Sequence, residues 1–179
     1  FTPADNLIAS GNVFIEFNSV RTVSGVGWEN RSALAAINII TKAIYSLTNT
    51  DGTSDTITIP EGTGDAAKTI SLQVSRSGDT RSAASVFWDV IADESVSTEN
   101  ALVDTSDFSA ESTRLPGGVV SFAANETVQT INIGISQDKK YELDEMFRVA
   151  LSEANSNNST STEISAAQSS IDVILTTDD

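Results

Sequence analysis

The chain has 179 residues, of which 39% are hydrophobic, which is enough for one medium-sized domain or one domain with an extension. Its formal net charge of −15 argues against nucleic acid and anionic lipid as partners, because binding phosphate requires clustered Lys and Arg. The chain contains no cysteine and no histidine, which excludes disulfides, Ser-His-Asp and Cys-His catalysis, and zinc sites built on those residues. No apolar run approaches the ~20 residues of a membrane helix, so no membrane insertion is expected.

The acidic charge is unevenly distributed. Residues 1–60 contain 5 acidic and 3 basic residues, whereas residues 61–179 contain 20 acidic and 7 basic residues. This asymmetry predicts a boundary near residue 55, with an N-terminal extension or arm over 1–55 and a β-sandwich over 56–179.

The extension contains two candidate elements. Val13, Ile15 and Phe17 alternate with polar residues, a pattern that predicts a strand. Residues 30–45 are rich in Ala and carry apolar residues at helical spacing, which predicts one short helix; one or two strands across Ile37–Leu47 are the alternative. Thr48–Asp55 is polar and turn-rich, and is expected to form a linker or a hairpin.

From Ile57 onward, apolar and polar residues alternate in about seven segments, the number expected of an immunoglobulin-type β-sandwich. The residues that carry the alternation are Ile57 and Ile59; Ile70, Leu72 and Val74; Val86, Trp88 and Val90; Val120 and Phe122; Ile131, Ile133 and Ile135; Phe147, Val149 and Leu151; and Ile171, Val173 and Leu175. The fold class is therefore predicted as all-β. Asp93–Asp107 and Asn155–Thr162 are expected to be loops.

Several motifs within these segments resemble a known family. Ile135–Leu151 contains an apolar strand, an acidic turn, Glu-x-x-Glu, and then Phe-x-Val-x-Leu. Upstream, Gly118–Glu126 resembles a Gly-x-Val-x-Phe-x-x-Gly-Glu hairpin, and Val74–Gly78 resembles Val-x-Arg-x-Gly. In order and spacing these motifs resemble the Calx-beta family, whose β-sandwich modules occur in sodium/calcium exchangers, integrin β4 and bacterial surface proteins. The resemblance covers about two-thirds of the chain, and residues 1–50 have no counterpart in it.

The resemblance implies a calcium site at one end of the sandwich, because the family holds metal there with loops that are distant in sequence. Ca²⁺ takes 6–8 oxygen ligands, for which carboxylates are well suited. Carried over position by position, the metal ligands are Glu61, Asp93, Asp138, Glu142, Glu145, Asp178 and Asp179. Here the acidic turn is diluted by Gln137, Lys139 and Lys140, so a solvated acidic edge without metal remains the alternative.

A catalytic role is not expected. Glu142 and Glu145 have the residue types of a glycosidase pair, but such enzymes need an aromatic-lined cleft and only 6% of the residues are Phe, Trp or Tyr. We therefore expect a non-catalytic protein with no catalytic and no organic-cofactor residues.

Two functions follow from these patterns. The first is an extracellular structural or adhesion module of a secreted or cell-surface assembly, stabilised by Ca²⁺. The start at Phe1 is interpreted either as leader removal or as a cut from a longer chain, and both fit a secreted protein. The second is a self-assembling subunit of an extracellular filament or virion surface, in which the N-terminal arm donates a strand to a neighbour. The expected partners are other protein domains or copies of the chain itself, with surface glycans as a further candidate.

Overall fold

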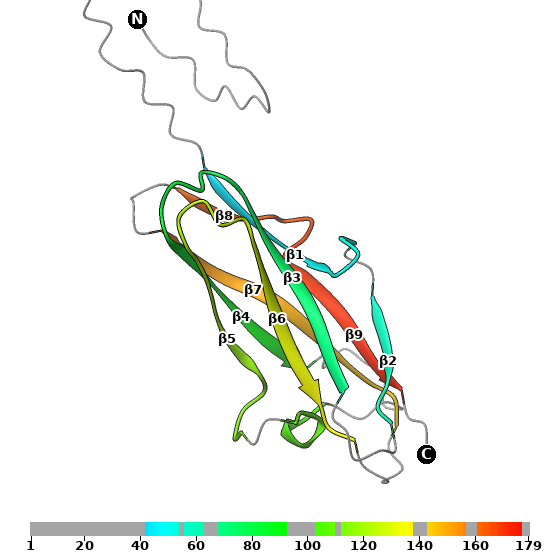
Figure 1. Cartoon of the computed structure of the whole chain (residues 1–179). Coiled ribbons are helices and arrows are strands. Elements are labelled where there is room, and N and C mark those ends of the chain that lie inside the picture. Colours follow the sequence, from blue (N-terminus) through cyan, green and yellow to red (C-terminus); the bar gives the residue numbers. More distant parts are fainter. Residues whose placement is uncertain are drawn as a thin grey trace, which may run out of the picture. The chain divides into compact units, whose positions relative to one another are not determined.

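Alternating apolar residues build two β-sheets that pack face to face in this computed structural model (Figure 1). The structure describes residues 42–53, 56–62, 68–92, 103–109, 112–137, 143–156 and 161–176, all of them within one unit that spans residues 38–179. The all-β sandwich predicted from the sequence is confirmed.

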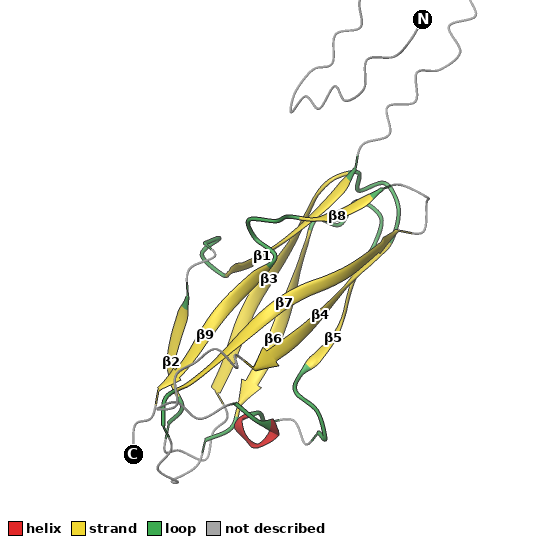
Figure 2. Cartoon of the chain, turned by 180° about the vertical axis from the view of Figure 1, so that it is seen from behind, coloured by secondary structure: helices red, strands yellow, loops and turns green. Residues whose placement is uncertain are grey.

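The first sheet has four strands in the order β6 (Val128–Ile135), β3 (Lys68–Gly78), β1 (Ala43–Asn49) and β8 (Thr162–Ile164). The second has five, in the order β2 (Ile57–Pro60), β9 (Ser170–Thr176), β7 (Glu145–Ser156), β4 (Ala84–Ala92) and β5 (Gly117–Phe122). One 3₁₀ turn, η1 (Thr105–Asp107), lies beside the end of β6 (Figure 2).

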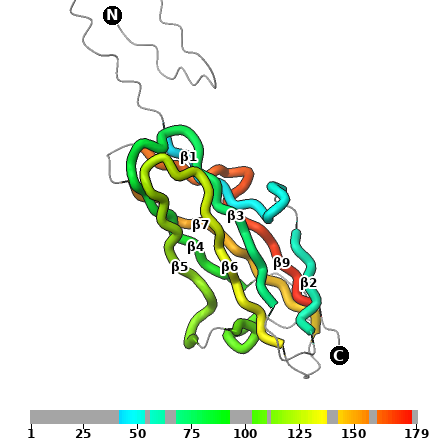
Figure 3. Tube along the Cα trace, in the orientation of Figure 1, coloured from blue at the N-terminus to red at the C-terminus, as the bar shows by residue number. Residues whose placement is uncertain are grey.

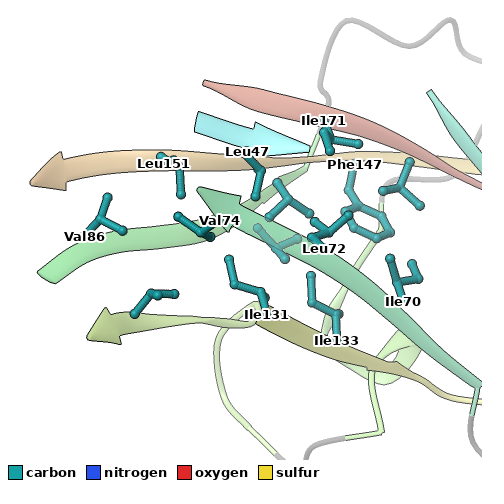
Figure 4. Packing of buried hydrophobic residues seen from close by; sticks show 14 of the residues in the cluster. Leu47, Ile70, Leu72, Val74, Val86, Ile131, Ile133, Phe147, Leu151 and Ile171 are labelled. Atoms are coloured by element: carbon teal, nitrogen blue, oxygen red, sulfur yellow. The ribbon is translucent and has the colours of Figure 1, made fainter. Parts of the chain in front are cut away.

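All seven segments predicted downstream of Ile57 are strands. Their apolar residues point between the sheets because side chains alternate from one face of a strand to the other. Leu72 and Val74 of β3 are buried against Phe147 of β7 and Ile171 of β9, among others (Figure 4). Trp88, whose place in the alternation with Val86 and Val90 predicts an inward position, is only half-buried and packs against the core.

The sandwich begins earlier than the predicted boundary near residue 55. β1 pairs with β3 from Ala43↔Gly78 to Asn49↔Leu72, and its residues Ala43, Tyr45 and Leu47 are fully buried. The strand alternative is therefore correct for residues 43–47, and the helix prediction is wrong for residues 43–45. Residues 30–41 of that predicted helix lie outside the described residues, as does the predicted strand Val13–Phe17.

Two parallel pairings join segments that are far apart in the sequence. β1 pairs with β8 in the first sheet. β2 pairs with β9 in the second sheet, and Figure 3 shows these two strands side by side. β8 begins at Thr162, the last residue of a predicted loop, and no alternation of large apolar residues predicted it. Within the described ranges, no helix has the length and hydropathy needed to span a membrane.

Candidate calcium-binding end of the sandwich

Two of the predicted ligands lie on opposite sides of the last residues of β9. Pro60 of β2 is aligned with Thr176, and the N–H of Glu61 donates to the Thr176 carbonyl at 3.0 Å. On the other side, Glu145, the first residue of β7, is aligned with Leu175. The structure therefore brings Glu61 and Glu145, which are 84 positions apart in sequence, to the same end of one sheet.

Both glutamates occupy positions that continue the inward-facing alternation of their strands. Glu61 follows Ile57 and Ile59 at a spacing of two, and Glu145 precedes Phe147 by two. Glu145 is only 7% exposed, in agreement with an inward position at the limit of the core. The inter-sheet space thus ends in carboxylates where the apolar residues stop.

A cation not identified from the sequence lies at this end. Lys68, the first residue of β3, is aligned with Ile135, and its Nζ donates to the Pro60 carbonyl at 2.6 Å. Lys68 alternates in step with Ile70 and Leu72, so its side chain belongs to the same inward face of β3. This spacing is the sequence pattern from which its position at the end of the core could have been predicted. Its positive charge lies beside the chain segment that carries Glu61, where it offsets part of the negative charge.

Gly62 permits the close packing of this corner. Its φ is +95°, a left-handed conformation that glycine adopts without steric cost. A Cβ placed on Gly62 would lie 2.8 Å from both Gln137 Nε2 and Lys68 Nζ. The segment after β2, the start of β3 and the end of β6 therefore meet at one point.

A third carboxylate, that of Asp107, lies near the same end. Asp107 of η1 is 4% exposed, and its side chain accepts a hydrogen bond from the backbone N–H of Asp104, so it closes a capping box. The Ser136 N–H donates to the Asp107 carbonyl at 2.9 Å, and Phe108 makes an edge contact with Phe147 at a centroid distance of 5.5 Å. η1 is therefore anchored at the end of β6.

The remaining predicted ligands, Asp93, Asp138, Glu142, Asp178 and Asp179, lie outside the described residues. In the part of the chain that the structure describes, no group of three or more acidic side chains is arranged to hold a metal ion. The described residues supply two carboxylates suited to Ca²⁺ and no complete coordination shell.

The strands that lead to the predicted ligands nevertheless share one end. β2, β6 and β9 end there, and β7 begins there, as the alignments of Lys68 with Ile135 and of Glu145 with Leu175 show. β4 ends at Ala92, which is aligned with Phe147 near the start of β7. The strand ends that flank the predicted ligands therefore lie together, while the calcium site itself stays a prediction.

The two packed sheets and their strand order define an all-β sandwich similar to Calx-beta domains. No protein-family model matches the chain, and no curated protein sequence matches it significantly. The similarity is to solved structures and concerns the fold.

Three solved structures illustrate this similarity. The apo-form Calx CBD1 domain matches with a TM-score of 0.54 and 19% identity, over 77% of this chain and 99% of that one. A structure described as the calcium binding domain CBD12 of CALX1.1 matches with a TM-score of 0.50 and 20% identity, over 77% of this chain and 45% of that one. A two-domain protein of unknown function from Bacteroides fragilis matches with a TM-score of 0.50 and 15% identity, over 76% and 46%.

Proposed function

We propose that the chain is a non-catalytic structural or adhesion module of a secreted or cell-surface assembly, stabilised by Ca²⁺ bound at the end that carries Glu61 and Glu145. The observation that carries this proposal is the position of these two glutamates on either side of the last residues of β9, at inward-facing sites. A structure with a similar fold is described as a calcium binding domain, which supports the choice of metal.

Calcium would act here by cancelling repulsion between carboxylates. Two inward carboxylates at the edge of a core interact more strongly than they do in water, because the local dielectric constant is lower. A divalent cation shared by the strand ends would remove this repulsion and hold the loops together. Lys68 would supply part of the compensation when no metal is bound.

A thermal melt in Ca²⁺ and in chelator tests the metal. At a free Ca²⁺ concentration 100 times the dissociation constant, binding contributes about 2.7 kcal/mol, which raises the melting midpoint of a domain of this size by roughly 10 °C. The double variant Glu61→Gln/Glu145→Gln should lose most of this shift. Glu153→Gln, an exposed position on the same strand β7, is the matched control and should retain it. Equal midpoints of the unmodified chain in Ca²⁺ and in chelator would remove the calcium proposal.

We base the cell-surface location on the composition, which combines a strongly negative charge with abundant Ser, Thr and Asn. Labelling of intact source cells with a membrane-impermeant amine reagent tests it. The chain should be labelled without lysis, and labelling that depends on lysis would contradict an exposed location.

A second candidate function is self-assembly through the N-terminal arm. One observation favours it: β1 ends its pairing with β3 at Asn49↔Leu72, while β3 extends to Lys68. Part of β3 therefore has no strand on the β1 side within the described residues. Native mass measurement of the full chain, compared with a variant lacking residues 1–41, tests this candidate, and a monomer in both would exclude it.

A further inference from the structure

A cleft of about 300 Å³ lies between the two sheets on the side where β1 stops. One wall is formed by Ile57, Thr58 and Ile59 of β2, and the opposite wall by Thr69, Ile70 and Ser71 of β3. β2 is the outer strand of its own sheet, and among the described residues it pairs with β9 alone.

The β3 wall presents backbone groups that no described strand pairs. The Arg76 N–H donates to the Thr127 carbonyl, on the β6 side of β3. Successive residues of an antiparallel strand direct their N–H and C=O groups to opposite sides, so Thr69 and Ser71, at odd positions, direct theirs away from β6. On that side the alignment of β1 with β3 has already ended at Leu72.

The β2 wall is open in the same way. The Glu61 N–H donates to the Thr176 carbonyl of β9. Residues at odd positions of β2 therefore direct their backbone N–H and C=O groups toward β9, whereas Thr58 directs its groups to the opposite side. The carbonyl of Pro60, like that of Thr58, points away from β9, and it accepts a hydrogen bond from Lys68 Nζ at 2.6 Å. Two open strand edges therefore border one cleft.

Two features flank the residues that line the cleft. The Lys68–Pro60 hydrogen bond joins the residues that neighbour Thr69 and Ile59. At the other end Asn49 belongs to the turn Asn49–Thr53, where the Thr53 N–H donates to Asn49 Oδ1 at 2.9 Å and Gly52 has a φ of +87°. Between these limits Lys68–Ser71 covers about 13 Å at the rise of an antiparallel strand, which is room for a segment of four or five residues.

The chemistry of the cleft matches an extended peptide. None of the described residues that line it is aromatic or cationic, which disfavours a sugar stacked on a ring and disfavours an anion. Ile57, Ile59 and Ile70 supply apolar contacts, and the open edges supply alternating backbone donors and acceptors. Strand addition uses this combination: main-chain hydrogen bonds give affinity, and contacts to alternate side chains give specificity.

We propose that this cleft accepts Val13–Phe17 from the arm of a second copy of the chain, which adds a strand between β2 and β3. The segment has five residues, and Val13, Ile15 and Phe17 alternate so that all three can face the isoleucines of the cleft. This inference deepens the second candidate function and does not depend on calcium.

The positions of the donor and the acceptor allow exchange between copies. The arm joins the sandwich at Lys42, at the start of β1, whereas the cleft lies beyond the other end of β1 at Asn49. The 24 residues between Phe17 and Lys42 reach up to about 80 Å when extended. Donor and acceptor sites on different ends of a subunit produce head-to-tail contacts, which build rings where the rotation between subunits closes and open filaments where it does not.

Electrostatics permit the approach of the arm. Residues 1–41 contain three acidic and two basic residues, so the arm is nearly neutral, while the remaining 22 acidic and 8 basic residues lie in 42–179. Two acidic sandwiches repel each other, whereas a nearly neutral arm approaches one without a comparable electrostatic cost.

Cysteine cross-linking tests the contact, because the natural chain has no cysteine. Full-length Glu16→Cys, whose side chain would lie on the same outer face as the exposed Thr69, is mixed under oxidising conditions with isotopically labelled full-length Thr69→Cys, and mass spectrometry quantifies the mixed disulfide. The matched control replaces the acceptor with Ser121→Cys, on β5, which is an outer strand remote from the cleft in the strand order. We expect at least tenfold more mixed disulfide with Thr69→Cys than with Ser121→Cys.

Native mass measurement of two further full-length variants completes the test. Ile15→Asp places a charge against the isoleucines and should abolish oligomers. Glu16→Gln, whose side chain would lie on the opposite face of the added strand, should keep them. If oligomers form but Thr69→Cys and Ser121→Cys give equal yields of mixed disulfide, the cleft is not the acceptor site, although self-assembly is retained. A purely monomeric, folded chain would overturn both. Cross-linking of the double variant Glu16→Cys/Thr69→Cys only within single chains would overturn exchange between copies.

Discussion

Tyr45 of β1 and Arg76 of β3 are aligned directly opposite each other, with 0% and 3% of their surfaces exposed. Burial raises the pKa of the Tyr45 hydroxyl, and the nearby charge of Arg76 acts in the opposite direction. Arg76 Nη2 donates to the carbonyls of Asp79 at 3.0 Å and Ser82 at 2.7 Å. A buried cation thus holds the β3–β4 connection onto the end of the sandwich opposite the candidate calcium site.

Arg76→Met should lower the free energy of unfolding by about 3 kcal/mol, because it leaves buried carbonyls without their charged donor. Arg81→Met, which removes a side chain that is 60% exposed, should cost less. Urea unfolding of both variants at pH 7 measures the difference. Equal losses of unfolding free energy in the two variants would contradict the role assigned to the buried Arg76.

Asp79 should make the stability depend on acidic pH. Hydrogen bonds from the Arg81 side chain, and then from its backbone N–H, lower the pKa of Asp79 from 3.8 to about 2. Because the pKa is lower in the folded state, the ionised carboxylate stabilises the fold above about pH 4, and this contribution is lost as the pH falls toward 2.

The comparison of Asp79→Asn with the unmodified chain isolates this contribution from the relief of overall negative charge. We expect the urea midpoints of the two proteins to differ most at pH 6 and to converge near pH 2. A constant difference over this range would contradict the assignment.

Two glycines with positive φ differ in what surrounds them. Gly52 has a φ of +87° and open space around it, whereas a Cβ on Gly78, with a φ of +76°, would lie 1.9 Å from the Lys42 carbonyl oxygen. Gly52→Ala should cost about 1 to 2 kcal/mol, the strain of a left-handed residue. Gly78→Ala should cost clearly more, because backbone at the start of β1 must move. Thermal melts of the two variants make the comparison, and equal midpoints would contradict it.

Phe147 links the core to η1. It is fully buried and makes an edge contact with Phe108. Phe147→Ala should lower the free energy of unfolding by about 3 to 5 kcal/mol through lost burial and an unfilled cavity. Phe87→Ala, on the outer face of β4 and 38% exposed, is the control and should cost much less. Denaturant midpoints measured with unchanged m-values provide the check.

Most strands were predictable from the sequence because each prediction depended only on local alternation. Ile131, Ile133 and Ile135 specify the inner face of β6 regardless of what β6 pairs with. β1 was harder, since its residues also fit a helical spacing, and only pairing with β3 decides between the two. β8 has three residues, too few for periodicity to identify.

The candidate calcium site, like the fold, was predictable from the sequence only in part. Oxygen ligands and an acidic character were evident from residue types, and the family resemblance singled out Glu61 and Glu145. The role of Lys68 was not evident, because a lysine before a strand is usually solvated, and only the tertiary structure places it beside Pro60 and Gly62. Likewise, no local pattern indicates that Asp107 is buried within its own capping box.

The amino-acid sequence by itself determined which faces of the strands are buried, since alternation is a property of consecutive residues, and it excluded chemistry that needs cysteine or histidine. Only the tertiary structure decided which strand ends meet, where β1 stops along β3 and that a cleft opens beside Thr69. The physical reason is that strand pairing and sheet packing join residues far apart in the chain, whose proximity depends on the register of all the intervening strands.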